Sequence, residues 1–192
     1  MSDAGSIKVL AVCGSLRKAS YNMAALRVAI AQKPSNMTVE VADISQIPPY
    51  NEDVRQQGFP PTVETFRRQI AAADALLFAC PEYNYSMSGV LKNAIDWASR
   101  PFPDNVLRYK PTAVVGASTG LFGAVWAQAE VRKTMKASGA HVLEDELPVG
   151  MADYAFADGS DALADPELTA RLKDLLGDLV REVNTPVEAS SS

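Results

Sequence analysis

The feature that most constrains the fold is an alternation of short apolar runs with helix-type patterns. The first run, Ile7–Cys13, is almost continuously apolar and ends at Gly14, and residues 75–80 and 111–118 form two more such runs. Residues 38–43 instead alternate apolar and polar side chains. Continuous runs of this length are typical of parallel strands covered on both faces, whereas alternation indicates a strand with one face less buried, as at a sheet edge.

Helical spacing separates these runs, and a short fifth strand is predicted at residues 141–144. Apolar side chains recur three and four residues apart in each helical segment, the last of which carries them between residues 168 and 183. Five strands alternating with five helices predict one α/β domain over residues 1–184, a doubly wound parallel sheet with helices on both faces. The polar, serine-rich residues 185–192 are predicted to be a disordered tail.

The connection over residues 44–61 is longer than an ordinary crossover loop. It contains two proline pairs, Pro48-Pro49 and Pro60-Pro61, which are interpreted as excluding a helix from it. Its role stays open between a functional or interface element and a tethered surface loop.

Residues 14–22, after the first strand, combine residue types that bind anions. Ser20 is a candidate N-cap for the following helix, so unpaired backbone N–H groups and the positive end of the helix dipole meet at this loop. Arg17 adds a fork of donors, and Ser15, Ser20 and Asn22 add neutral ones. The pattern predicts a phosphate cradle. The alternative is an ordinary strand-to-helix turn with solvated charges, because the loop lacks the glycine patterns of dinucleotide-binding and P-loop sites.

Two further loops follow buried strands and offer polar groups suited to a flat ligand. In residues 81–86, Pro81 fixes one backbone angle, and the N–H groups after it suit the polar edge of a planar heterocycle. Tyr83 and Tyr85 can flank such a ring, although tyrosines in a loop are otherwise amphipathic surface residues. A glycine-rich turn over residues 118–123 ends the fourth strand and is predicted to cap the same ligand.

Two motifs occur in this order in the chain: Gly-Ser-Leu-Arg-x-x-Ser-x-Asn after the first strand and Pro-Glu-Tyr-Asn-Tyr-Ser after the third. Together they resemble the NAD(P)H-dependent FMN reductase family, most closely its chromate and quinone reductase branch, over about residues 8–150. The resemblance implies a flavodoxin-like strand order, 2-1-3-4-5. In that order the loops after strands one, three and four meet at one edge of the sheet, by the switch point where ligands bind.

FMN fits these three loops, since it has both a phosphate and a flat polar ring, and the resemblance implies the same cofactor. NADH or NADPH is the implied co-substrate. The predicted FMN-binding residues are Ser15, Arg17, Ser20, Asn22, Pro81, Glu82, Tyr83, Asn84, Tyr85, Ser118, Thr119 and Gly120.

The predicted site supplies no obvious acid, base or nucleophile, so the flavin is expected to carry the chemistry. Hydride would pass from NAD(P)H to FMN, and electrons would then pass to a second small molecule in the same space, by ping-pong turnover. The resemblance implies quinones, free flavins, azo or nitro compounds, or chromate as acceptors. Arg100, after the third helix, is a candidate contact for an anionic substrate, or else it balances the negative helix C-terminus.

Cys13 and Cys80 close the first and third strands and are interpreted as small core residues. The alternative is a pair of redox thiols beside the cofactor. The single histidine, His141, has no second histidine or cysteine cluster to join it, so no metal site is predicted.

Charge and hydropathy argue against several partner classes. The 192-residue chain has 23 acidic and 18 basic residues, a net charge of −5, so it offers no basic stripe for nucleic acid and an anionic membrane would repel it. It has no apolar run near the roughly 20 residues of a membrane span and no signal-peptide pattern, so a cytoplasmic protein is expected. The family resemblance implies a homodimer or homotetramer.

Two other functions remain open from the sequence. A flavodoxin-type carrier would keep the flavin site but exchange single electrons with protein partners and use no nicotinamide. A non-redox nucleotide-binding or regulatory domain would take up no FMN.

Overall fold

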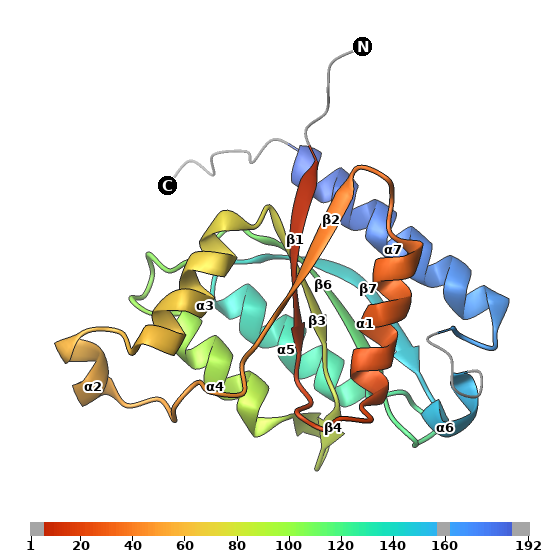
Figure 1. Cartoon of the computed structure of the whole chain (residues 1–192), viewed down its shortest axis with the longest axis horizontal. Coiled ribbons are helices and arrows are strands. Elements are labelled where there is room, and N and C mark those ends of the chain that lie inside the picture. The colour runs from red at the N-terminus through yellow and green to blue at the C-terminus, as the bar shows by residue number, and fades with distance from the viewer. Residues whose placement is uncertain (1–5, 157–161, 186–192) are drawn as a thin grey trace.

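A five-stranded parallel sheet forms the centre of the computed structural model, which describes residues 6–156 and 162–185. The strand order is β2-β1-β3-β6-β7, so the five strands, counted along the chain, follow the predicted flavodoxin-like order 2-1-3-4-5 (Figure 1). The strands are β1 (Ile7–Cys13), β2 (Met37–Ala42), β3 (Ala75–Ala79), β6 (Pro111–Ala117) and β7 (His141–Val149). The predicted tail lies outside the described residues, apart from Thr185.

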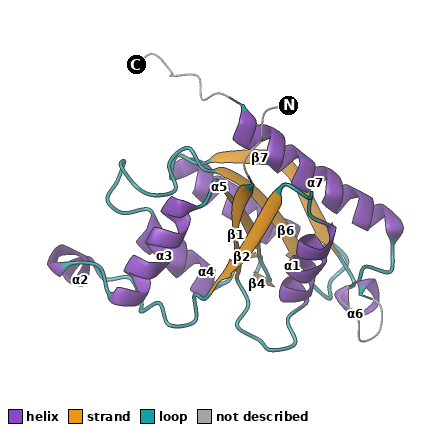
Figure 2. Cartoon of the chain, turned by 45° about the horizontal axis from the view of Figure 1, so that its top comes forward, coloured by secondary structure: helices purple, strands orange, loops and turns teal. Residues whose placement is uncertain are grey.

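Helices cover both faces of the sheet, as predicted (Figure 1, Figure 2). Because side chains alternate along a strand, Val9 and Ala11 of β1 face one helical layer, while Leu10 and Val12 face the other. The first layer contains α1 (Tyr21–Gln32) and α7 (Pro166–Asn184), and the second contains α3 (Pro61–Ala72), α4 (Gly89–Ala98) and α5 (Val125–Ala137). Strand β2 lies at one edge of the sheet and is partly exposed, which confirms its predicted edge position.

The loop over residues 44–61 contains a helix, contrary to the prediction. Helix α2 (Glu52–Gln57) fits between the two proline pairs, and the Asn51 side chain caps it by accepting a hydrogen bond from the Asp53 N–H at 2.8 Å. The second proline pair interrupts no helix, because Pro61 is the first residue of α3, where a missing N–H costs nothing. The prolines in this loop therefore lie before or at the start of helices and do not exclude them.

The same loop is fastened to α4. The Trp97 indole donates to the Pro48 carbonyl at 2.8 Å, and the Asn93 side chain donates to that carbonyl at 2.9 Å and accepts from the Tyr50 N–H at 2.7 Å. Trp97 is fully buried, with its ring edge-to-face against Tyr50 and Phe59. The loop is thus part of the packed structure on this side of the molecule.

Two other segments differ from the prediction. Residues 82–87 fold into a small antiparallel hairpin, β4 (Glu82–Tyr83) and β5 (Ser86–Met87), where a loop was expected. Strand β7 continues to Val149, beyond the predicted residues 141–144, and it includes the charged residues 144–146. Arg132 and Lys136 of α5 pair with two of these carboxylates, so the charges are compatible with an outer strand. A short helix, α6 (Ala152–Ala155), follows β7.

Within the described residues, no helix combines the length and the apolar character needed to cross a bilayer.

Candidate flavin site

The loops after β1, β3 and β6 meet at the carboxyl edge of the sheet around one pocket of about 310 Å³. Figure 1 shows β4, the start of α1 and α6 gathered at this end of the sheet. Nine of the twelve predicted FMN-binding residues line the pocket, and Asn84, Tyr85 and Gly120 do not. The lining residues are Ser15, Arg17, Ser20, Tyr21, Asn22, Pro81, Glu82, Tyr83, Ala117, Ser118 and Thr119.

The first loop has the features of an anion site. The Ser20 hydroxyl caps α1 by accepting from the Met23 N–H at 3.2 Å, as predicted. The Gly14 N–H donates to the Ala79 carbonyl, and the Arg17 N–H lies 3.4 Å from the Ser15 hydroxyl. The backbone N–H groups of Ser15 and Leu16, which lie between Gly14 and Arg17, have no acceptor among the described residues. They belong to the loop that leads into α1, whose Ser15, Arg17 and Ser20 line the pocket, so this loop can receive a phosphate.

Asn22 lines the pocket and also has a structural role. Its side chain is buried, donates to the Ala117 carbonyl and accepts from the Ala117 N–H, both at 2.9 Å. These two hydrogen bonds tie the start of α1 to the end of β6. Asn22 therefore holds two walls of the pocket together, and the second N–H of its amide remains for a ligand.

The hairpin after β3 is held against α5. Asn84 and Tyr85 at its tip have φ of 53° and 61°, the left-handed pair that a tight two-residue hairpin turn requires. The Glu82 carboxylate accepts hydrogen bonds from the backbone N–H groups of Trp126 and Ala127, at 3.0 and 3.2 Å. Since α5 has no side-chain cap of its own at Ala124, Glu82 stabilises the helix start and fixes the hairpin at the same time.

The third loop, after β6, is fixed by close backbone contacts. Gly123 has φ of 57°, and a Cβ atom there would lie 2.6 Å from the backbone at Pro148 and Val149, so only glycine fits. The Gly120 carbonyl accepts from the Met151 N–H at 3.0 Å. Gly120 thus shapes the loop, while its neighbours Ser118 and Thr119 line the pocket.

Arg100 lies away from this pocket. It follows α4, and a crossover helix runs antiparallel to the strands, so its C-terminus lies towards the amino edge of the sheet. The Arg100 side chain donates to the Tyr50 hydroxyl at 3.1 Å, and its carbonyl accepts from Arg67, which also binds the carbonyls of Trp97 and Ala98. In this chain Arg100 helps to fasten the loop over residues 44–61, and its predicted substrate contact has no support from these contacts.

The two thiols face opposite sides of the sheet. Cys13 packs in the layer with α1 and α7, and Cys80 packs in the layer with α3, α4 and α5. Both are buried, and burial raises the pKa of each thiol above its usual value. A buried neutral thiol is a poor nucleophile, so these contacts favour the interpretation as core residues.

His141 lies beside Glu182 and against the Tyr109 ring at the start of β7. Among residues 6–156 and 162–185, no group of three or more histidine, cysteine or acidic side chains is placed to hold a metal ion.

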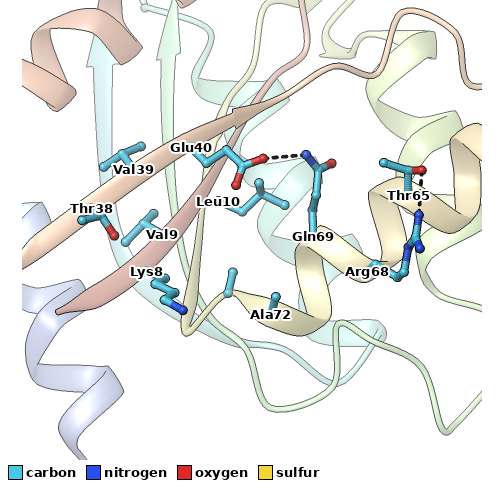
Figure 3. Close-up of a pocket in the computed structure, with 11 residues that line it drawn as sticks. Lys8, Val9, Leu10, Thr38, Val39, Glu40, Thr65, Arg68, Gln69 and Ala72 are labelled. Atoms are coloured by element: carbon cyan, nitrogen blue, oxygen red, sulfur yellow. Dashed lines mark hydrogen bonds between the residues drawn. The ribbon is translucent and has the colours of Figure 1, made fainter. Parts of the chain in front are cut away.

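A larger cavity lies elsewhere, and it lacks the features of a cofactor site. It measures about 620 Å³ and lies between the sheet edge and α3 (Figure 3). Gln69 of α3 donates to Glu40 of β2 at 2.7 Å across it. Its size follows from the open flank of the edge strand β2, and no loop from the carboxyl edge contributes to it.

Sequence reasoning missed Tyr21, Ala117 and Trp126. The Tyr21 ring stacks on Phe156, with 5.9 Å between the ring centroids. The Arg17 guanidinium carbon lies 5.3 Å from the Tyr21 ring centroid, so Tyr21 packs against the Arg17 side chain. Its position between Ser20 and Asn22 was an available signal. Trp126 had no such signal, because its contact with the hairpin depends on how α5 is placed.

The sheet order defines a flavodoxin-like fold, and its pocket offers donors suited to a phosphate beside a backbone suited to a flat ring. A model of the family described as NADPH-dependent FMN reductase matches residues 7–153, and the chain belongs to this family. This membership confirms the predicted enzyme class, an NAD(P)H-dependent FMN reductase, with FMN as cofactor and NAD(P)H as co-substrate.

Individual relatives agree. An NAD(P)H-dependent FMN reductase of Pseudomonas aeruginosa is 58% identical over 157 residues, which cover 81% of this chain and 83% of the relative. A quinone reductase of Pseudomonas putida is 43% identical over 135 residues, covering 70% and 72%. The solved structure of FerB, a flavoenzyme NAD(P)H:(acceptor) oxidoreductase from Paracoccus denitrificans, superposes with a TM-score of 0.81 at 31% identity, covering 93% of this chain and 97% of FerB.

The residues of the pocket fit FMN. The donors at residues 15–20 suit a terminal phosphate, and the backbone between Pro81 and Tyr83 and the turn at Ser118 and Thr119 lie on the other side of the same pocket, where a ring would be held. When bound there, FMN supplies hydride and electron transfer.

Proposed function

We propose that this enzyme catalyses the reaction NAD(P)H + H⁺ + quinone → NAD(P)⁺ + hydroquinone through bound FMN, with both substrates using the same exposed ring face in turn. One observation carries the proposal: the phosphate cradle and the hairpin that would hold the ring line the same pocket. The names of the relatives, an FMN reductase and a quinone reductase, support the same reaction.

Each part of the chain has a separate task in this reaction. Ser15, Arg17 and Ser20 bind the phosphate, and Asn22 keeps that loop against the end of β6. Glu82 is held by the N-terminus of α5 and fixes the hairpin beside the ring. Tyr83 is 53% exposed and borders the space in which nicotinamide and acceptor would stack.

A visible spectrum of the purified protein tests the cofactor and the hydride donor together. The protein saturated with FMN should show flavin absorbance, which should bleach when NADH or NADPH is added without air and return when a quinone follows. A colourless protein that takes up no FMN would instead indicate a non-redox nucleotide-binding domain. Flavin that neither nucleotide bleaches would indicate a flavodoxin-type carrier.

Initial rates test whether one ring face serves both substrates. Because nicotinamide must leave before the acceptor enters, double-reciprocal plots against NADPH at several quinone concentrations should be parallel, as in other ping-pong enzymes. Each substrate at high concentration should inhibit competitively against the other. Intersecting lines would mean a ternary complex with two sites and would contradict this part of the proposal.

The same assay with free flavins, azo and nitro compounds and chromate compares the other acceptors that the family resemblance implied. For the assembly we propose a homodimer or homotetramer, which sedimentation of the FMN-loaded protein would test. For the compartment we propose the cytoplasm, which fractionation of the source cells would test.

A further inference from the structure

Three exposed aromatic side chains form a cluster next to the flavin pocket. Trp126, at the start of α5, makes edge-to-face contacts with Tyr85 at 5.2 Å and with Phe122 at 5.4 Å between ring centroids. The exposed fractions are 42% for Trp126, 73% for Tyr85 and 60% for Phe122. Aromatic surface that is gathered and left open to solvent on a folded protein commonly marks a binding site.

The cluster is continuous with the pocket. Tyr85 follows Tyr83 in the hairpin, Phe122 follows Ser118 and Thr119 in the third loop, and Tyr83, Ser118 and Thr119 all line the pocket. The N–H of Trp126 donates to Glu82, another lining residue. A ligand on the exposed side of the flavin ring would therefore meet this cluster as the next wall.

The cluster is also held in place before any ligand arrives. Glu82 ties the hairpin that carries Tyr85 to the helix that carries Trp126. Tyr85 is kept at φ of 61°, a left-handed conformation that bulky residues rarely adopt. Such strain is tolerated where the surroundings enforce it and is concentrated at binding sites.

The charges near the cluster favour one kind of ligand. The three aromatic side chains are neutral, and the carboxylate of Glu82 accepts from the backbone N–H of Trp126 beside them. Among the residues that line the pocket, the one cation is Arg17, which belongs to the phosphate cradle. A planar neutral ring would stack on these rings, whereas an oxyanion such as chromate would meet their negative faces and the Glu82 carboxylate.

We propose that Tyr85, Phe122 and Trp126 form an acceptor subsite that takes the ring of a planar, uncharged aromatic electron acceptor, such as a naphthoquinone, in preference to an oxyanion. This subsite rests on the proposed function, since it serves the second substrate of that reaction. It makes the three aromatic residues determinants of acceptor specificity.

Binding without turnover gives the first test. Oxidised, FMN-loaded protein is titrated with 2-methyl-1,4-naphthoquinone in a calorimeter, with no electron donor present. Trp126→Ala should weaken binding at least fivefold and Tyr85→Ala at least twofold, because each change removes a ring on which the quinone would stack. Phe102→Ala, which removes a 67% exposed aromatic residue after α4, is the matched control and should change the affinity by less than twofold. Unchanged binding by both site variants would overturn the proposal.

Reoxidation of pre-reduced enzyme gives the second test and compares acceptor classes. The flavin is reduced with dithionite, so the measurement does not depend on nicotinamide. Trp126→Ala should slow reoxidation by the naphthoquinone at least fivefold and reoxidation by chromate less than twofold, and Trp126→Phe, which keeps a ring, should restore most of the quinone rate. Equal slowing with both acceptors would show a general defect and would overturn the proposed selectivity.

The two levels of the proposal fail in different ways. If the unaltered protein binds no FMN, or its FMN is not reduced by NADH or NADPH, the proposed function is wrong. If the unaltered protein passes those tests but the aromatic variants bind and reduce the quinone normally, only the acceptor subsite is wrong. Should Trp126→Ala bind no FMN because it fails to fold, Trp126→Phe and Tyr85→Ala make the same comparison.

Discussion

The carboxyl-edge loops and the loop over residues 44–61 contain similar residue types and use them in opposite ways. In the loop over residues 44–61, the Pro48 carbonyl accepts hydrogen bonds from the side chains of Asn93 and Trp97. Tyr50 forms hydrogen bonds with the side chains of Asn93 and Arg100. At the carboxyl edge, the backbone between Gly14 and Arg17 has N–H groups with no acceptor among the described residues. The aromatic rings there are exposed, whereas Trp97 is buried.

This difference separates structural polar groups from functional ones. A polar group whose hydrogen bonds are complete within the chain contributes to stability and has little left to offer a ligand. A loop that keeps donors free must be held in place by other contacts, and here Asn22, Glu82 and Gly123 supply them. We therefore expect changes in the two regions to affect different measurements.

The largest expected effect is the loss of stability in Trp97→Ala. The change removes a fully buried ring and its 2.8 Å hydrogen bond to Pro48. It should lower the free energy of unfolding by about 3 to 5 kcal/mol, measured by urea denaturation. Trp97→Phe keeps a ring and should cost less, while FMN affinity of the folded protein should change by less than about threefold in both variants. A large loss of FMN affinity at full folding would show that the two regions are coupled.

Arg17→Ala should have the converse effect. A hydrogen bond to a charged group contributes roughly 1.5 to 3 kcal/mol, so FMN affinity should fall about ten- to a hundredfold, measured by flavin fluorescence titration. The free energy of unfolding of the flavin-free protein should change by less than about 0.5 kcal/mol, because Arg17 is exposed. Lys18→Ala, the neighbouring exposed cation, should change affinity much less, and riboflavin, which has no phosphate, should not distinguish the Arg17 variant from the parent.

The sequence predicted the sheet and its order but not the details at its margins. The apolar run of β3 indicated a central strand and the alternation of β2 indicated an edge strand, because burial acts on every residue of a strand. Helix α2 was missed because proline was interpreted as a barrier, although residues 50–59 between the proline pairs leave room for the six residues of this helix. The hairpin at residues 82–87 was missed because two-residue strands leave almost no periodicity.

The site residues could be predicted where a local motif carries them. Ser15, Arg17 and Ser20 follow from a strand, a polar loop and an N-cap that are adjacent in sequence. The hydrogen bonds of Asn22 to Ala117 and of Glu82 to Trp126 join residues far apart in the chain, and no local pattern reveals them. Arg100 was considered for a substrate contact because its position along α4 was not related to the direction of the strands.

Cys13 and Cys80, at the ends of β1 and β3, lie at the same edge of the sheet as the ligand-binding loops. Because both are buried, we expect them to affect stability, as the loop over residues 44–61 does. Burial raises the pKa of the Cys80 thiol well above its usual 9.0. Below that value both folded and unfolded thiols are neutral, so Cys80 adds no pH dependence. Above it the unfolded thiol ionises while the folded one stays protonated, so the folded state loses stability as the pH rises, by up to about 1.4 kcal/mol per pH unit. The difference in unfolding free energy between the parent and Cys80→Ala should therefore shift in favour of the variant between pH 8 and 10, measured by urea denaturation. A pH-independent difference would contradict the burial argument.

The smallest expected effect concerns Glu82. This residue lines the pocket, but its carboxylate already accepts two hydrogen bonds from the backbone of α5, so it shares features of both regions. Glu82→Ala leaves the start of α5 without a cap and should lower the free energy of unfolding by about 1 kcal/mol. Asp165→Ala is a matched control, because the Asp165 side chain caps α7 by accepting from the Glu167 N–H at 2.8 Å, away from the pocket. Both variants should lose similar stability, but only Glu82→Ala should also free the hairpin and alter the fluorescence of Trp126, which is the exposed one of the two tryptophans. If the two variants give the same fluorescence, Glu82 is a helix cap alone, and the hairpin is positioned by its own turn.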